Sequence, residues 1–190
     1  ADNALFYIVK DLADDTRHLG RETVKSFGVR SRFVHFEFFR LLSDHEGLGK
    51  KGDLMALEVN MRPSGGFTPD MINFARETDV YKIWADMVAY DSTQKPVGAH
   101  HFCAFAGLRD GKDFAMTPDA IIEKYTEQLK MVERMPDALA DAMGNQMYLA
   151  TFDTEEALNA FFADVTRLKE VDTSEESETA ETIVVQVERT

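Results

Sequence analysis

Two carboxylates and one amide near the start of the chain are spaced so that neighbouring strands could bring them together. Glu37 lies in the Phe-rich run 32–42 (RFVHFEFFRLL), and Glu58 and Asn60 lie in the run 54–60 (LMALEVN). Residues two apart on a strand share a face, so Glu58 and Asn60 point the same way. If the two runs pair, Glu37 lies beside Glu58, and the two charges repel unless a cation or a proton sits between them. Two carboxylates and an amide oxygen suit Mg²⁺ or Mn²⁺.

The surroundings of Glu37 make a positive partner necessary. Phe flanks it on both sides, so we expect its carboxylate to be buried, at a cost of several kcal/mol if it stays unpaired. The simpler alternative is a structural polar cluster satisfied by Arg or Lys. His35 shares a strand face with Glu37 and either orients that carboxylate or is a hydrogen-bonded core histidine.

Residues suited to phosphate binding follow directly after Asn60 in the sequence. Arg62 carries a guanidinium that can grip a phosphate or a carboxylate with two hydrogen bonds, although a salt bridge to a nearby acid is the plainer alternative. Gly65 and Gly66 let the backbone approach a ligand closely. Asp70 and Asn73 come next, where helix capping is favoured over contact with a substrate. Metal ligands, an arginine and a glycine loop together indicate phosphoryl transfer.

The stretch that contains FVHFEFF and ALEVNMRPSGGFTPD resembles the C-terminal lobe of ATP-grasp enzymes, a superfamily that includes biotin carboxylase and many carboxylate–amine ligases. In that superfamily a glutamate on one strand and a glutamate-x-asparagine on its neighbour coordinate two Mg²⁺ ions that bridge the phosphates of ATP. Glu37, Glu58 and Asn60 match those positions. Arg62 matches an arginine that contacts the phosphate or the substrate carboxylate. The specific match covers residues 33–67.

The resemblance implies an ATP-dependent ligase that forms an acyl phosphate from a small carboxylate, which an amine or another nucleophile then attacks. Arg62 and the metal ions would offset the charge on the transferring phosphoryl group. The alternatives are a non-catalytic module that senses nucleotide or packs against a partner, and an acidic structural domain without a ligand.

The resemblance also implies that part of the enzyme lies elsewhere. In the superfamily, lysines on the adenine side and a flexible glycine-rich loop come from upstream sequence, and residues 1–32 contain no convincing counterpart. We therefore expect a fragment that is inactive without the N-terminal lobe. An apolar face exposed by the loss of that lobe would favour a homodimer.

Composition narrows the remaining classes of protein. The 190 residues are 44% hydrophobic and carry a formal net charge of −13, which disfavours nucleic acid and anionic membranes as partners. Cys103 is the single cysteine, so no internal disulfide can form, which fits a reducing cytoplasm. No apolar run approaches the roughly 20 residues of a membrane helix, and the first residues do not read as a signal peptide.

Hydrophobic periodicity and turn residues predict an α+β fold, with an antiparallel sheet flanked by helices. Thr68 or Asp70 is expected to cap the helix that follows it, Asp79 the next helix, and Thr154 the last one. The residues after the strand 97–106 are expected to form a turn and its pairing partner. Residues 5–9 are expected to be a short buried strand or a helix edge. The other predicted strands are 32–42, 54–60, 97–106 and 146–152, and the predicted helices are 14–27, 69–76, 80–90, 118–134, 136–144 and 155–169.

Three segments follow from these elements. Residues 1–106 form the part that resembles the ATP-grasp C-terminal lobe. Residues 107–170 form a C-terminal α/β extension without a chemical motif. Residues 171–190 form an acidic linker followed by a terminal strand or tail.

Overall fold

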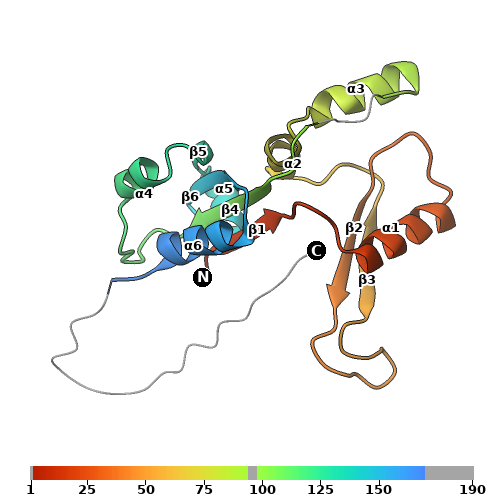
Figure 1. The fold of residues 1–190 in the computed structure, drawn as a ribbon, viewed down its shortest axis with the longest axis horizontal. Coiled ribbons are helices and arrows are strands. Elements are labelled where there is room, and N and C mark those ends of the chain that lie inside the picture. Colours follow the sequence, from red (N-terminus) through yellow and green to blue (C-terminus); the bar gives the residue numbers. More distant parts are fainter. Residues whose placement is uncertain (1, 94–97, 170–190) are drawn as a thin grey trace. The chain divides into compact units, whose positions relative to one another are not determined.

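A computed structural model of the chain describes residues 2–93 and 98–169, which form an α+β fold in two compact units (Figure 1). The hairpin unit contains the described residues between 8 and 101. The sheet unit contains residues 2–7 and 102–169. The predicted linker and tail over 171–190 lie outside the described residues.

The sheet unit is built on four strands in the order β1-β4-β6-β5. β6 is central and runs antiparallel to both of its neighbours, so its backbone groups are paired on two sides. The strands are β1 (Ala4–Ile8), β4 (Phe102–Leu108), β5 (Leu129–Arg134) and β6 (Gln146–Phe152), and the helices are α4 (Pro118–Lys124), α5 (Asp137–Met143) and α6 (Glu155–Thr166).

The core of the sheet unit lies where alternate residues of β4 and β6 meet α4 and α6. Tyr148 on β6 pairs with Ala106 on β4, and both are buried. Phe161 of α6 is fully buried and meets the ring of Tyr125 edge to face, with 4.9 Å between ring centroids. Thr154 caps α6 as predicted, by accepting a hydrogen bond from the amide of Ala157.

The hairpin unit contains one antiparallel pair of strands and three helices. Arg40 at the end of β2 forms two hydrogen bonds with the carboxylate of Asp15 on α1, which ties the first helix to the hairpin. The strands are β2 (His35–Arg40) and β3 (Leu54–Asn60), and the helices are α1 (Asp14–Ser26), α2 (Thr68–Arg76) and α3 (Val80–Tyr90). None of the helices described in either unit is long and apolar enough to cross a membrane.

The structure corrects the predicted helix 118–134. α4 ends at Lys124, and residues 129–134 form β5 on the edge of the sheet. The reason is long-range pairing: β5 satisfies its backbone by hydrogen bonding to β6, which local helical spacing does not reveal. Likewise the partner of β4 is β6, and not the residues that follow β4. Those residues form a loop in which Phe114 makes a single bridge to Leu168.

The caps of the helices after the glycine loop also differ from expectation. Neither Thr68 nor Asp70 caps α2, whose N-cap residue is Phe67. The carboxylate of Asp70 instead accepts a hydrogen bond from the hydroxyl of Tyr81 on α3. Asn73 does act at a helix start, but at α3, where its side-chain oxygen accepts from the amide of Val80. Asp79 caps α3 as predicted.

Candidate functional site

The hairpin places the two predicted carboxylates opposite each other. β2 and β3 pair antiparallel as the sequence predicted, and the register sets Glu37 directly across from Glu58. The next pair of residues on the same face is His35 across from Asn60. The register shifts immediately after Glu37, so this face ends in a local irregularity of the kind that re-aims side chains. One face of the hairpin therefore presents two acids, an amide and an imidazole.

Polar contacts connect the members of this face in pairs. The amide nitrogen of Asn60 donates to Oε1 of Glu58 over 2.7 Å. Nε2 of His35 lies 3.5 Å from Oε1 of Glu37. Among the described residues, no Lys or Arg forms an ion pair with either glutamate. The structural alternative, a cluster neutralised by Arg or Lys, is therefore not what the hairpin contains.

Glu37 is less buried than its Phe neighbours suggest. Its side chain keeps 36% of its surface exposed, and Glu58 is exposed. The expectation of a buried carboxylate is wrong because β2 belongs to a two-stranded sheet, whose faces remain partly open. The acidic pair therefore destabilises the hairpin by about 0.2–1 kcal/mol, the range for like charges on facing strands. The larger penalty of a buried charge does not apply.

His35 contributes a feature that sequence reasoning did not find. Its Nδ1 atom is buried and has no hydrogen-bond partner among the residues that the structure describes, so the alternative of a hydrogen-bonded core histidine is not what these residues form. Because the imidazole ring of His35 lies beside the carboxylate of Glu37, the orientation of each side chain constrains the other. The spacing His-x-Glu on a strand predicts that both side chains lie on one face. It does not predict that one ring nitrogen of His35 is buried.

Arg62 and the two glycines lie in the loop between β3 and α2. The guanidinium of Arg62 is exposed and donates to the carbonyl of Pro63 over 3.0 Å, without an ion pair to any described acid. Gly66 has a φ of +58°, a left-handed backbone that favours glycine. Gly65 has open space where a side chain would begin. The loop thus offers a free cationic group and an uncovered backbone just before the N-terminus of α2, where amide groups favour anions.

The donor set of the hairpin face fits a hard divalent cation. Two carboxylates and an amide oxygen supply only oxygen atoms, and Mg²⁺ completes its shell with water or phosphate oxygens. The side chain of Asn60 presents its nitrogen to Glu58, and a half-turn of the amide presents its oxygen instead. Within the described residues, no group of three or more His, Cys, Asp and Glu side chains is arranged to hold a metal. A metal bound at this face would therefore be held by the two carboxylates and the amide of Asn60.

The other residues that could carry chemistry have ordinary surroundings. His100 lies 3.5 Å from Asp11, and His101 lies 3.6 Å from Glu77, so the two histidines face different acids and do not converge. Cys103 is buried in β4, and burial raises the pKa of its thiol to about 12, which keeps it protonated and unreactive at neutral pH.

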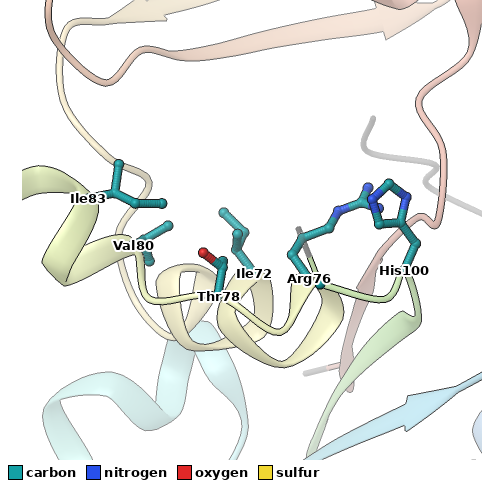
Figure 2. A pocket seen from close by; sticks show the side chains of 7 residues that line it. Ile72, Arg76, Thr78, Val80, Ile83 and His100 are labelled. Atoms are coloured by element: carbon teal, nitrogen blue, oxygen red, sulfur yellow. The ribbon is translucent and has the colours of Figure 1, made fainter. Parts of the chain in front are cut away.

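A separate hollow in the hairpin unit lies along α2 and α3 and does not include the predicted site residues. Its volume is about 320 Å³, and Ile72, Val80 and Ile83 give it apolar walls (Figure 2). The guanidinium of Arg76, at one end, donates to the carbonyls of Val9 and Lys10 and so holds the chain that follows β1. This arginine therefore has a structural role.

A comparison with models of known protein families and with curated proteins finds no match for this chain.

Proposed function

We propose that this chain is part of an ATP-dependent carboxylate ligase and supplies the half of the Mg-ATP site that holds the phosphates, as the C-terminal lobe of an ATP-grasp fold does. The observation that carries the proposal is the direct opposition of Glu37 and Glu58, with Asn60 on the same face. Facing acids weaken a hairpin, and a bound cation turns this repulsion into attraction. Arg62 and the glycine loop follow at the end of the same strand.

Each residue has a defined task in the proposed site. Glu37, Glu58 and Asn60 would hold Mg²⁺, and the metal would neutralise negative charge on the phosphates of ATP. Arg62 would bind the transferring phosphoryl group or the carboxylate substrate with its guanidinium fork. Gly65 and Gly66 would let backbone amides approach a phosphate oxygen. These side chains position and stabilise charge, so none of them needs to act as a nucleophile.

The test is calorimetric titration of the chain with ATP, with and without Mg²⁺. We expect weak, saturable binding that requires the metal, because one lobe offers half of the contacts. Glu37→Gln and Glu58→Gln should each abolish it, since each substitution removes a charged metal ligand and keeps the size of the side chain. Arg62→Gln should weaken nucleotide binding, while metal binding measured without nucleotide stays intact.

Glu46→Gln is the matched control, because Glu46 is an exposed acid in the loop of the same hairpin. It changes the net charge by the same amount and should leave the titration unchanged. The proposal fails if the parent chain binds no nucleotide in the presence of Mg²⁺. It also fails if Glu37→Gln, Glu58→Gln and Arg62→Gln all bind as the parent does, because binding would then occur elsewhere.

A further inference from the structure

The sheet unit contains a cavity of about 300 Å³ for which the proposed function has no use. It opens between the loop after β4, the start of α4 and the ends of β5 and β6. Leu108, Phe114 and Ile121 give it an apolar wall. Its size matches the lower end of the range for small-molecule sites. The cavity is thus large enough for a small metabolite with a ring or a short aliphatic body.

One buried hydroxyl on this cavity has no partner within residues 2–93 and 98–169. Tyr148 lines the cavity and is fully buried, and its hydroxyl forms no hydrogen bond in the described structure. A buried hydroxyl is normally satisfied, so an unpartnered one calls for an acceptor that is absent from the protein itself. Burial raises the pKa of Tyr148, and the nearby carboxylate of Asp119 adds to the effect. The group is therefore a hydrogen-bond donor at neutral pH.

Positive charge gathers around the cavity of an otherwise strongly acidic chain. The cavity is lined by four cationic side chains and two acidic ones. The cations are Arg109, Lys112, Arg134 and Lys169, and the acids are Asp110 and Asp113. The whole chain has a net charge of −13. Arg109 is committed to the carbonyls of Asp2, Ala140 and Asp141. Of the other three, Arg134 and Lys169 pair with the two acids, and Lys112 has no ion pair among the described residues.

Those cations are held by contacts that a ligand can replace. Arg134 pairs with Asp110 through two hydrogen bonds of 2.8 and 2.6 Å, and Lys169 pairs with Asp113 at 2.8 Å. Both pairs are more than half exposed, and exposed pairs contribute little to stability. Lys112 forms no ion pair within the described part of the chain. An anionic ligand can therefore form contacts with these cations in place of the acids without disrupting the fold.

We propose that this cavity binds a small molecule that joins a carboxylate or phosphate group to an apolar body. The hydroxyl of Tyr148 donates a hydrogen bond to the anionic group, Arg134 and the lysines at the rim neutralise its charge, and the apolar body packs against Phe114 and Ile121. The site is independent of the proposed Mg-ATP half-site, since all of its residues belong to the sheet unit.

The experiment titrates the full chain with benzoate, phenyl phosphate and the neutral benzamide, and follows the methyl signals of Met116 and Ile121 by NMR. Both residues line the cavity, and the methyl of the buried Met71, which belongs to the hairpin unit, serves as a reference outside the cavity. We expect saturable shifts with at least one of the two anions and none with benzamide. Comparing the anions tells whether the site prefers carboxylate or phosphate.

Two substitutions then identify the contacts. Tyr148→Phe removes one oxygen, and Arg134→Gln removes the guanidinium. Each should weaken binding of the preferred anion roughly tenfold, the usual loss for a hydrogen bond to a charged group. Lys130→Gln is the control, because it removes a cation from the same strand outside the cavity, and it should bind as the parent does. The proposal is overturned if neither anion binds, if benzamide binds equally well, or if Tyr148→Phe leaves the affinity unchanged, which would mean that water alone meets this hydroxyl.

Discussion

The two units of this protein bury apolar side chains to very different extents. Among the residues that the structure describes, seventeen buried apolar residues belong to the sheet unit and four belong to the hairpin unit. Large exposed apolar side chains show the reverse distribution, with ten in the hairpin unit and four in the sheet unit. The unit that contains the candidate metal and phosphate residues is thus the one with the smaller core.

The two units therefore hold their residues in place by different kinds of interaction. In the sheet unit, burial of apolar surface dominates stability. In the hairpin unit, polar links such as Arg40 to Asp15 and Arg76 to the backbone do much of the positioning. A unit with a small core tolerates facing acids because its faces are open to water. We expect it to gain more stability from a bound cation than the sheet unit does.

The largest effect should come from removing a ring from the core of the sheet unit. Phe161→Ala should cost about 3–5 kcal/mol, as for other buried Phe residues. Phe39→Ala in the hairpin unit should cost about 1 kcal/mol or less, because that ring is 49% exposed. Urea unfolding followed by circular dichroism measures both, and fluorescence of Trp84, the single tryptophan, reports on the hairpin unit separately. Equal losses from the two substitutions would contradict the comparison.

Glycine substitutions give the next largest contrast. A Cβ on Gly107 would lie 1.7 Å from the carbonyl oxygen of Met143, so Gly107→Ala forces backbone apart and should cost about 3 kcal/mol. Gly65→Ala meets nothing within 4 Å and should change stability by less than about 0.5 kcal/mol. Any loss of nucleotide binding in Gly65→Ala would then be local to the loop. If Gly65→Ala instead lowers the unfolding midpoint as Gly107→Ala does, the loop has a structural role.

The same contrast explains which parts of the molecule sequence patterns could predict. The hairpin from 35 to 60 is a local pairing, and alternation was enough to set Glu37 against Glu58. Capping by Asp79 and Thr154 is also local and was predicted correctly. Strand β5 depends on a partner that follows it across α5, so its residues were taken for the end of a helix.

The cavity of the sheet unit could not be predicted for the same reason. Tyr148 and Arg134 come together only through the pairing of β5 with β6. A helix over 118–134 would have placed Arg134 on a different element, with no relation to β6. Burial of single atoms, such as Nδ1 of His35 or the hydroxyl of Tyr148, depends on packing that residue types do not specify.

A smaller effect is expected at alkaline pH. Burial and the neighbouring carboxylate of Asp164 raise the pKa of Tyr125 above the ordinary value of 10.0. Its contribution to stability is therefore complete below that value and is lost as the pH rises above it, because the unfolded chain releases the proton first. Tyr125→Phe should flatten this loss in urea titrations across the alkaline range. Tyr81→Phe in the hairpin unit should flatten it less, because Tyr81 is 52% exposed. A larger change in the alkaline loss of stability for Tyr81→Phe than for Tyr125→Phe would contradict the proposed difference in burial.

The most direct test of the central claim is a titration with Mn²⁺ in which the free ion is followed by electron paramagnetic resonance. The claim is that Glu37 and Glu58 face each other to hold a divalent cation. We predict that the chain removes Mn²⁺ from solution in a saturable way and that Mg²⁺ competes for the site. We also predict that Glu58→Gln abolishes binding while Glu46→Gln preserves it. Binding that survives Glu58→Gln, or no binding by the parent chain, would contradict the claim.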